Sequence, residues 1–396
     1  MKKHFLRKIL LPLAVAFIFC ACNDPIFFTM SHEVKPTDPL IEGAPANFAV
    51  FNDAMYTASG SRLYRYTGTS SLGAGNWDRS TPPPGGRILQ IASTSEFLYA
   101  LVLENQNSNR TAIKRFNNTL WQNIEDSSTQ TRTINYIFAA DDTLFVGAAT
   151  GNSHVILYVD KDEADITSAI KELKLDGDIV AAGEIRGAVF DGTNYYICTR
   201  NRGVYKVNDF SQEALQLPNP MDDEGEERRI NYTGIISLDD NNNTILLIAR
   251  NGEIFTINNS VIESKGNLGG HIRLATGALA IWIDKEDSSR RLLLAGRQDS
   301  LVYTIDSGYT YGYLELELDE NGIKTDATFK EPGMPGLSSV FDNDRYKSTI
   351  GKHPVNFIFQ APNGIDDNMT LFASTQKSGV WSYRERGGVP QWNAEE

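Results

Sequence analysis

The sequence has few of the residues on which metal binding and covalent catalysis most often depend. Its 396 residues include three cysteines and five histidines. Apart from His4, the histidines are His32, His154, His271 and His353, and none has the spacing of a ligand motif such as H-E-x-x-H. No P-loop, dinucleotide fingerprint or nucleophile elbow is present. The sequence therefore predicts no catalytic residue, no metal and no cofactor, and it favours a protein without enzymatic activity.

The chain also lacks an apolar run long enough to cross a bilayer. The segment "ILLPLAVAFIF" has 11 residues and follows the basic residues Lys2, Lys3, Arg7 and Lys8. A basic start followed by a short apolar run is typical of a signal peptide, whereas a membrane-spanning helix needs about 20 apolar residues. We therefore expect residues 1–21 to be removed.

The end of this segment points to a lipid anchor. Cys22 directly follows the small residue Ala21, which resembles the lipobox of bacterial lipoproteins. The resemblance implies that Cys22 carries a diacylglycerol and further acyl chains such as palmitate. Phe19 departs from the usual leucine and Cys20 is a competing candidate, so an ordinary secretory signal is the alternative. Several acyl chains on one residue give stable anchoring, because a single chain is marginal.

The resemblance also predicts where the protein resides. We expect a cell-envelope protein that is lipid-anchored to a bacterial membrane, at the outer membrane or the cell surface rather than the inner membrane. Asn23, and not aspartate, follows the lipidated cysteine, so the inner-membrane retention signal of the enterobacterial kind is missing. With Cys22 acylated, Cys198 has no partner for a disulfide, and its strand-like surroundings "NYYICTR" predict a buried, inert thiol.

Positive charge is scarce as well. Without the four basic residues of the signal, 33 Lys and Arg stand against 50 Asp and Glu, a net charge of −17. Such a balance disfavours nucleic acid as a partner.

What the chain does contain is a repeat. The hairpin "RNRGVYKVND" at 200–209 recurs as "RNGEIFTINN" at 250–259 and more distantly as "QKSGVWSYRE" at 376–385. The last apolar residues of such hairpins are separated by 50, 43, 48, 50, 48 and 78 residues. A period of 40 to 50 residues indicates a propeller or a solenoid. The markers are Tyr66, Phe116, Val159, Val207, Ile257, Ile305 and Tyr383.

Each repeat consists of short apolar runs rich in β-branched and aromatic residues, bounded by Asn, Asp and Gly. Four such runs per unit and seven units predict an all-β fold, a seven-bladed β-propeller of four-stranded antiparallel blades, with six or eight blades and a β-solenoid as alternatives. In the sixth unit the third strand is expected at "LVYTI" and the fourth at "YLELELD". We assign a tether to residues 22–45, the propeller to 46–396, and an insertion to about 321–354, between blades six and seven.

The segment "TIDSGYTY", residues 304–311, resembles the Asp-box of sialidase-like propellers. Asp306, Gly308 and Tyr311 occupy the places of the Asp, the Gly and the aromatic residue of that motif, and Thr304 stands for its Ser. Asp-boxes are structural, so the resemblance supports the fold and implies no chemistry.

Candidate ligand-binding residues follow from the positions of the loops. In propellers, the loops entering the first strands and those joining second to third strands share one face. Arginines and asparagines recur there, whereas aspartates gather in the opposite loops. A structural explanation is that Asp and Asn favour turns and that Asn or Arg bonds the neighbouring blade. The functional alternative is a basic mouth for acidic ligands. The candidates are Arg186, Arg200, Arg202, Arg250, Arg273, Arg297, Asn135, Asn231 and Asn356.

These observations favour a lipid-anchored binding or scaffolding module for an envelope protein or an anionic glycan. Two alternatives remain. One is a sialidase-like glycan hydrolase, for which Arg186, Arg250 and Arg297 could imitate the arginine cluster. The other is an assembly factor for outer-membrane proteins, a task performed by one propeller lipoprotein family whose tryptophan and glycine repeats are missing here.

Overall fold

The computed structural model covers a ring of β-sheets. It describes residues 41–68, 76–79, 81–105, 110–124, 131–159, 169–176, 181–238, 244–267, 274–297, 312–319, 322–324, 326–329, 354–386 and 389–395. Within these ranges the secondary structure is strand, and no helix there could cross a membrane. The predicted signal segment and the "TIDSGYTY" motif lie outside the described residues.

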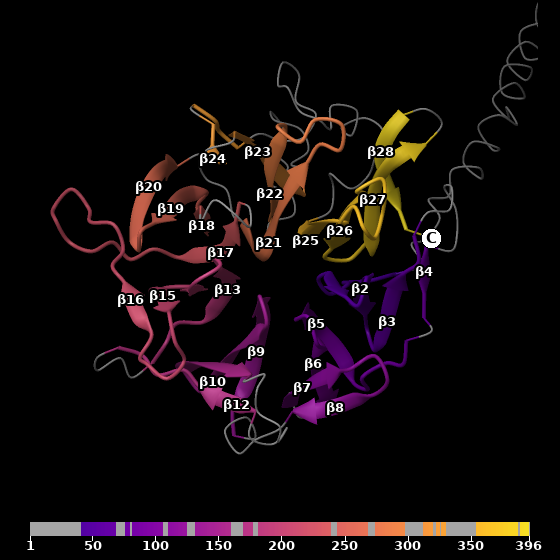
Figure 1. The fold of residues 1–396 in the computed structure, drawn as a ribbon, viewed down its shortest axis with the longest axis horizontal. Coiled ribbons are helices and arrows are strands. Elements are labelled where there is room, and N and C mark those ends of the chain that lie inside the picture. The colour runs from indigo at the N-terminus through magenta and orange to yellow at the C-terminus, as the bar shows by residue number, and fades with distance from the viewer. Residues whose placement is uncertain are drawn as a thin grey trace, which may run out of the picture. The chain divides into compact units, whose positions relative to one another are not determined.

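Seven four-stranded antiparallel sheets surround a central channel, which confirms the predicted seven-bladed propeller (Figure 1). The first strand of each blade lies innermost, next to the first strand of the following blade. Blades one to four consist of β1 (Ala49–Phe51), β2 (Ala54–Ser59), β3 (Arg62–Tyr66), β4 (Trp77–Asp78); β5 (Arg87–Ser93), β6 (Leu98–Asn105), β7 (Arg110–Phe116), β8 (Trp121–Ile124); β9 (Thr133–Ala140), β10 (Thr143–Thr150), β11 (Ser153–Val159), β12 (Ile170–Glu172); β13 (Ile185–Phe190), β14 (Tyr195–Thr199), β15 (Gly203–Val207) and β16 (Leu215–Leu217). Blades five to seven consist of β17 (Tyr232–Ser237), β18 (Ile245–Ala249), β19 (Glu253–Asn258), β20 (Val261–Asn267); β21 (Leu274–Ile283), β22 (Arg291–Arg297), β23 (Tyr313–Asp319), β24 (Gly322–Ile323); β25 (Val355–Gln360), β26 (Leu371–Thr375), β27 (Val380–Arg386) and β28 (Val389–Ala394).

The recurring hairpin is the turn between the second and third strands. In blade four, Thr199 Oγ1 donates to the carbonyl oxygen of Gly203 at 2.9 Å, and in blade seven Thr375 Oγ1 donates to Gly379 O at the same distance. Both glycines have positive φ, 81° and 77°, a conformation that costs glycine little. The turns of these two blades share one geometry, which explains why their hairpin sequences resemble each other.

The hydrophobic core is divided into layers between adjacent blades. The layer between blades four and five contains Cys198 and Val204 from one blade and Tyr232, Leu247 and Phe255 from the other, all buried. The side chain of Cys198 has no exposed surface, and this burial raises the pKa of its thiol. The prediction of a buried, inert Cys198 is therefore supported by its surroundings.

Blade six differs from its predicted strand assignment. We expected Tyr313–Asp319 to be the fourth strand, but it pairs with β22 as the third, with Leu293 opposite Leu316. The two-residue strand β24 then takes the fourth position. The prediction was wrong because "YLELELD" alternates well enough for either strand, and the hairpin spacing placed the third strand at Ile305, which lies outside the described residues.

Blades one and seven meet where the ring closes (Figure 1). Each is built from four consecutive strands, so no strand is shared between the two ends of the repeat. The segment 41–45, which we had assigned to the tether, packs on blade seven. Val380 N donates to Ile41 O at 3.2 Å, and Ser374 Oγ donates to Pro45 O at 2.8 Å.

Candidate functional site

A polar cavity of about 470 Å³ opens where loops of blades three, four and five meet. We call it the loop cavity. It is formed by the β10–β11 turn, the segments that lead into β13 and β17, and the β14–β15 turn. Its described lining residues are Asn152, His154, Ala181, Ala182, Gly183, Glu184, Arg200, Asn201, Arg202, Arg229, Ile230 and Asn231.

The β14–β15 turn is held by hydrogen bonds on both sides. Arg200 N donates to the carbonyl oxygen of Glu184 at 2.8 Å, and Gln216 Nε2 donates to Arg202 O at 2.6 Å. Gly203 ends the turn with its positive φ. These hydrogen bonds fix the backbone of Arg200 and Arg202, so this wall of the cavity has a defined position.

The loop cavity carries an excess of positive charge. Three guanidinium groups, those of Arg200, Arg202 and Arg229, stand against the single carboxylate of Glu184 among its described lining residues, and His154 lies beside them. Arg202 and Arg229 are exposed and form no ion pair with any other described residue. Guanidinium groups bind carboxylates and phosphates in a bidentate manner. The chemistry of the wall suits an anion.

Glu184 is held by two arginines of unequal exposure. Its Oε2 lies 2.6 Å from Arg186 Nη2 and 3.5 Å from Arg200 Nη1. The side chain of Arg186 is 9% exposed, and it also donates to the hydroxyl of Tyr136 at 3.1 Å with its guanidinium over that ring. Arg186 is therefore a buried support of Glu184, whereas Arg200, at 46% exposure, faces solvent.

A second ion pair lies close by, at the start of β19. Arg228 Nη1 and Nη2 donate to the two carboxylate oxygens of Glu253 at 2.6 and 2.7 Å. The hydrogen bonds of Arg228 hold the pKa of Glu253 below its ordinary value, and those to Glu253 raise the pKa of Arg228. Glu184 thus partly neutralises the predicted cations Arg186 and Arg200, and Glu253 neutralises Arg228, which was not predicted. The sequence analysis singled out neither carboxylate.

The loop cavity brings together three of the predicted ligand-binding residues, Arg200, Arg202 and Asn231, with Arg186 next to them. Arg229, His154, Asn152 and Asn201 complete it and were not predicted. Arg229 could have been found from its place just before the "INY" run that enters β17.

The other predicted residues lie elsewhere. Asn135 lines a cavity of the central channel, and Asn356 is half-buried in β25. Arg250 directly follows β18, and its backbone N donates to Asn231 O. Arg297 is the last residue of β22, and its backbone N donates to Gly312 O. Arg273 lies outside the described residues.

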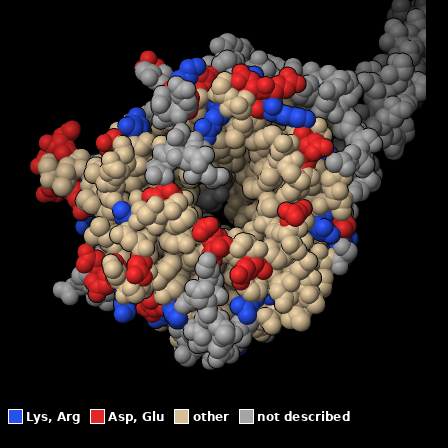
Figure 2. All heavy atoms as spheres, viewed as in Figure 1, with Lys and Arg blue, Asp and Glu red and all other residues tan. Residues whose placement is uncertain are grey.

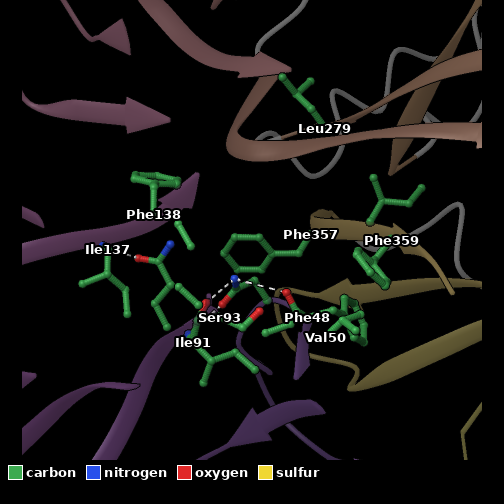
Figure 3. Close-up of a pocket in the computed structure, with 15 residues that line it drawn as sticks. Phe48, Val50, Ile91, Ser93, Ile137, Phe138, Leu279, Phe357 and Phe359 are labelled. Carbon is green, nitrogen blue, oxygen red and sulfur yellow. Dashed lines mark hydrogen bonds between the residues drawn. The ribbon is translucent and has the colours of Figure 1, made fainter. Parts of the chain in front are cut away.

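Two adjoining cavities occupy the central channel. The entrance channel cavity measures about 350 Å³ and is lined by Leu89, Gln90, Leu101, Asn135, Tyr136, Phe138, Glu184 and Phe357. The inner channel cavity measures about 380 Å³ and shares Gln90, Phe138 and Phe357 with the first. Phe138 of β9 and Phe357 of β25 reach into the space between the strands (Figure 3). The lining of the channel therefore combines aromatic side chains with polar groups such as Gln90 and Asn135.

Some polar side chains of the channel join adjacent blades. Asn47 Nδ2 donates to the carbonyl oxygen of Ile91 at 2.6 Å, and its Oδ1 accepts from Ile91 N at 2.8 Å. Gln90 Oε1 accepts from Ile137 N at 3.0 Å. These bonds support the structural explanation for polar residues at the inner strands, at least for Asn47.

The acidic loops of the opposite face contain turn-forming carboxylates. Burial opposes ionisation of Asp191, but hydrogen bonds from the backbone of Asn194 and Thr193 outweigh it and hold the pKa of this carboxyl below its ordinary value. Hydrogen bonds from the hydroxyl and the backbone of Ser289 likewise hold the pKa of the Asp287 carboxyl below its ordinary value. Within the described ranges, no three His, Cys, Asp or Glu residues lie close enough to hold a metal.

Figure 2 shows one face of the ring with a hollow at its centre. Uncharged residues form most of the visible wall of the hollow, and acidic side chains stand at several places around it.

No protein-family model and no curated protein sequence matches the chain. Solved structures do match in fold. An ancestral GH74 enzyme aligns with a TM-score of 0.56 and 14% identity, covering 91% of this chain and 48% of that one. An extracellular domain of a two-component system from B. thetaiotaomicron gives 0.51 and 11%, covering 87% and 38%. YCF48 from Cyanidioschyzon merolae gives 0.50 and 11%, covering 87% and 96%.

The chain thus spans about half of the GH74 structure, less than half of the extracellular domain and nearly all of YCF48. At such low identities the likeness shows the fold alone. The protein is a seven-bladed β-propeller, and its function has to be argued from its own residues.

Proposed function

We propose that the protein is a non-catalytic binding or scaffolding module of the cell envelope, and that the loop cavity takes an anionic ligand. The observation that carries the proposal is the excess of guanidinium groups over carboxylates in this cavity. A chain of net charge −13 has gathered Arg200, Arg202 and Arg229 at one place. Nearby charges dominate there, because salt screens those beyond about 8 Å.

Binding is favoured over glycan hydrolysis by the carboxylates present. Most glycosidases use two carboxyl groups on either side of the scissile bond, and sialidases use a tyrosine nucleophile instead. The described lining of the loop cavity supplies no tyrosine and one carboxylate, Glu184, which two arginines already engage. An acidic protein segment or an anionic glycan would each suit the cavity.

The double variant Arg202→Ser/Arg229→Ser is expected to weaken binding of a fluorescent octaglutamate peptide about 10-fold or more at low salt and to flatten the salt dependence of its affinity. Both side chains are exposed, so the fold should remain within about 0.5 kcal/mol of wild type. Fluorescence anisotropy at two ionic strengths measures the effect. The control Lys285→Ser/Arg290→Ser removes the same charge from exposed residues of the β21–β22 loop. Equal losses in both double variants would contradict a localised site.

We also propose that acyl chains on Cys22 anchor the propeller to a bacterial membrane. The proposal rests on the short apolar run that ends in Ala21-Cys22. Cys22→Ser is expected to abolish incorporation of a fatty-acid analogue and to shift the protein from the detergent phase to the aqueous phase, because the acyl chains supply the membrane affinity. Cys20→Ser is the matched control and should label like wild type. Unchanged labelling of the Cys22 variant would refute the anchor.

A further inference from the structure

We propose that the ligand is an extended polypeptide segment in which acidic residues are followed by an aromatic or large apolar residue. The acidic part would bind in the loop cavity, and the apolar side chain would enter the central channel. This inference rests on the proposed function and names the ligand class.

The two parts of the site adjoin each other. Glu184 lines both the loop cavity and the entrance channel cavity, so a chain bound at the arginines can continue over this residue toward the channel. The entrance channel cavity in turn shares Phe138 and Phe357 with the inner one. A ligand that crosses Glu184 therefore passes from a cationic wall to an aromatic wall.

Glu184 would repel an acidic ligand if it stood alone. Arg186, almost buried, contacts its carboxylate at 2.6 Å and neutralises it from within. Arg200 is the more exposed and the more distant partner, at 3.5 Å. Arg200 can therefore turn to a carboxylate of the ligand while Arg186 stays with Glu184.

The aromatic residues of the channel offer a place for an apolar side chain of the ligand. Leu89 at the entrance is 38% exposed, an unusual position for a large apolar residue in this chain. Phe138 and Phe357 reach into the channel (Figure 3). Gln90 Oε1 and both polar atoms of the Asn47 amide already bond to backbone across blades, which leaves them less able to bind sugar hydroxyls. Specific ligand sites combine such an apolar lining with a few polar groups, which the loop cavity supplies.

The test uses the full-length chain and labelled probes. The first set consists of dodecapeptides in which a phenylalanine stands at successive distances after a run of aspartates. The second set is identical except for serine in place of that phenylalanine, and the third probe is an octagalacturonate. The best phenylalanine peptide is expected to bind about 10-fold or more tightly than its serine twin, as burial of the ring predicts.

Two variants locate the apolar residue. Phe357→Ala should reduce the ratio between the twin peptides several-fold. Because this change could weaken folding, Leu89→Ser tests the same point at an exposed position and should also lower the ratio. Arg202→Ser/Arg229→Ser should weaken both peptides alike.

The outcomes separate this inference from the proposed function. Equal affinities of all twin peptides would overturn the channel while leaving anion binding in place. Tighter binding of octagalacturonate than of any phenylalanine peptide would overturn the polypeptide in favour of a glycan. If no anionic probe binds, the proposed function fails together with the inference. A preference for phenylalanine that neither Phe357→Ala nor Leu89→Ser alters would place the apolar residue outside the channel and overturn the inference.

Discussion

Replacing Glu395 with alanine is expected to lower the free energy of unfolding by about 3 to 5 kcal/mol, the usual cost of removing one partner from a buried ion pair. Glu395 lies where blade seven meets blade one. Its Oε2 accepts from Trp77 Nε1 at 2.8 Å, its Oε1 accepts from Ser382 Oγ, and Arg384 Nη2 lies 3.5 Å away. The side chain of Glu395 is 4% exposed and that of Arg384 is 16% exposed. Alanine would leave three polar groups without this partner.

The effect should be large because closure of this ring depends on side chains. Neither blade lends a strand to the other. Beyond the bonds of segment 41–45, the two blades share an apolar layer that includes Phe48, Trp77 and Phe372, and a connected set of polar groups lies beside it. Arg384 donates to the hydroxyl of Tyr66 at 3.0 Å, and this hydroxyl donates to the buried carboxylate of Asp366 at 3.0 Å. Burial, the largest cause, raises the pKa of Tyr66, so its hydroxyl stays a donor.

Urea unfolding followed by tryptophan fluorescence measures the change. The matched control is Lys324→Ala, which breaks the exposed pair between Lys324 and Glu317 and should cost at most about 1 kcal/mol. A second variant, Glu395→Gln, retains an acceptor for Trp77 and should be less harmful than alanine. If Glu395→Ala costs no more than the control, the closure does not depend on this network.

The number of blades was predictable from the sequence because similar hairpins and apolar runs recur along it. A tight turn with a left-handed glycine, as at Gly203, leaves a recognisable hairpin, and nearly continuous apolar runs mark the second strands, such as Tyr195–Thr199 and Ile245–Ala249. Blade six shows the limit of this reasoning. The alternating segment Tyr313–Asp319 fits the third and the fourth strand of a blade equally well. Its pairing with β22 shows that it is the third strand.

The candidate site was predictable in part for a similar reason. Knowledge of propeller loops places Arg200 and Arg202 at one end of blade four from sequence alone. The contact of Glu184 with Arg200 was not predictable, since it depends on packing of the segment before β13 against the β14–β15 turn, whereas Arg186 is two residues from Glu184 in the same segment. A list of arginines therefore overstated the free positive charge of this face, and the carboxylates decide which arginines remain available.

Phe255→Ala is expected to lower the free energy of unfolding by about 3 to 5 kcal/mol, through lost transfer free energy and a residual cavity. Aromatic residues recur at equivalent third-strand positions of the sequence repeat, Tyr205, Phe255, Tyr303 and Trp381, and this recurrence predicts that they pack between blades. The structure confirms burial for Tyr205, Phe255 and Trp381, and Tyr303 lies outside the described residues. The ring of Phe255 has no exposed surface and meets Tyr232 edge-on, with 5.6 Å between ring centroids.

Each blade is a separate hydrogen-bonded sheet, so the cavity left by alanine between two blades should collapse little. Phe255 belongs to the layer between blades four and five, and its neighbours are anchored in two separate sheets. The guanidinium of Arg228 lies 5.9 Å from the ring centroid while it is bonded to Glu253, so it cannot easily move in to fill the space. The measurement is again the urea midpoint. Val261→Ala, in the same blade and 54% exposed, is the control and should change stability by about 0.5 kcal/mol or less. A midpoint for Phe255→Ala equal to that of this control would mean that the layer between the blades can repack around a lost ring, and the aromatic repeat would then need another explanation.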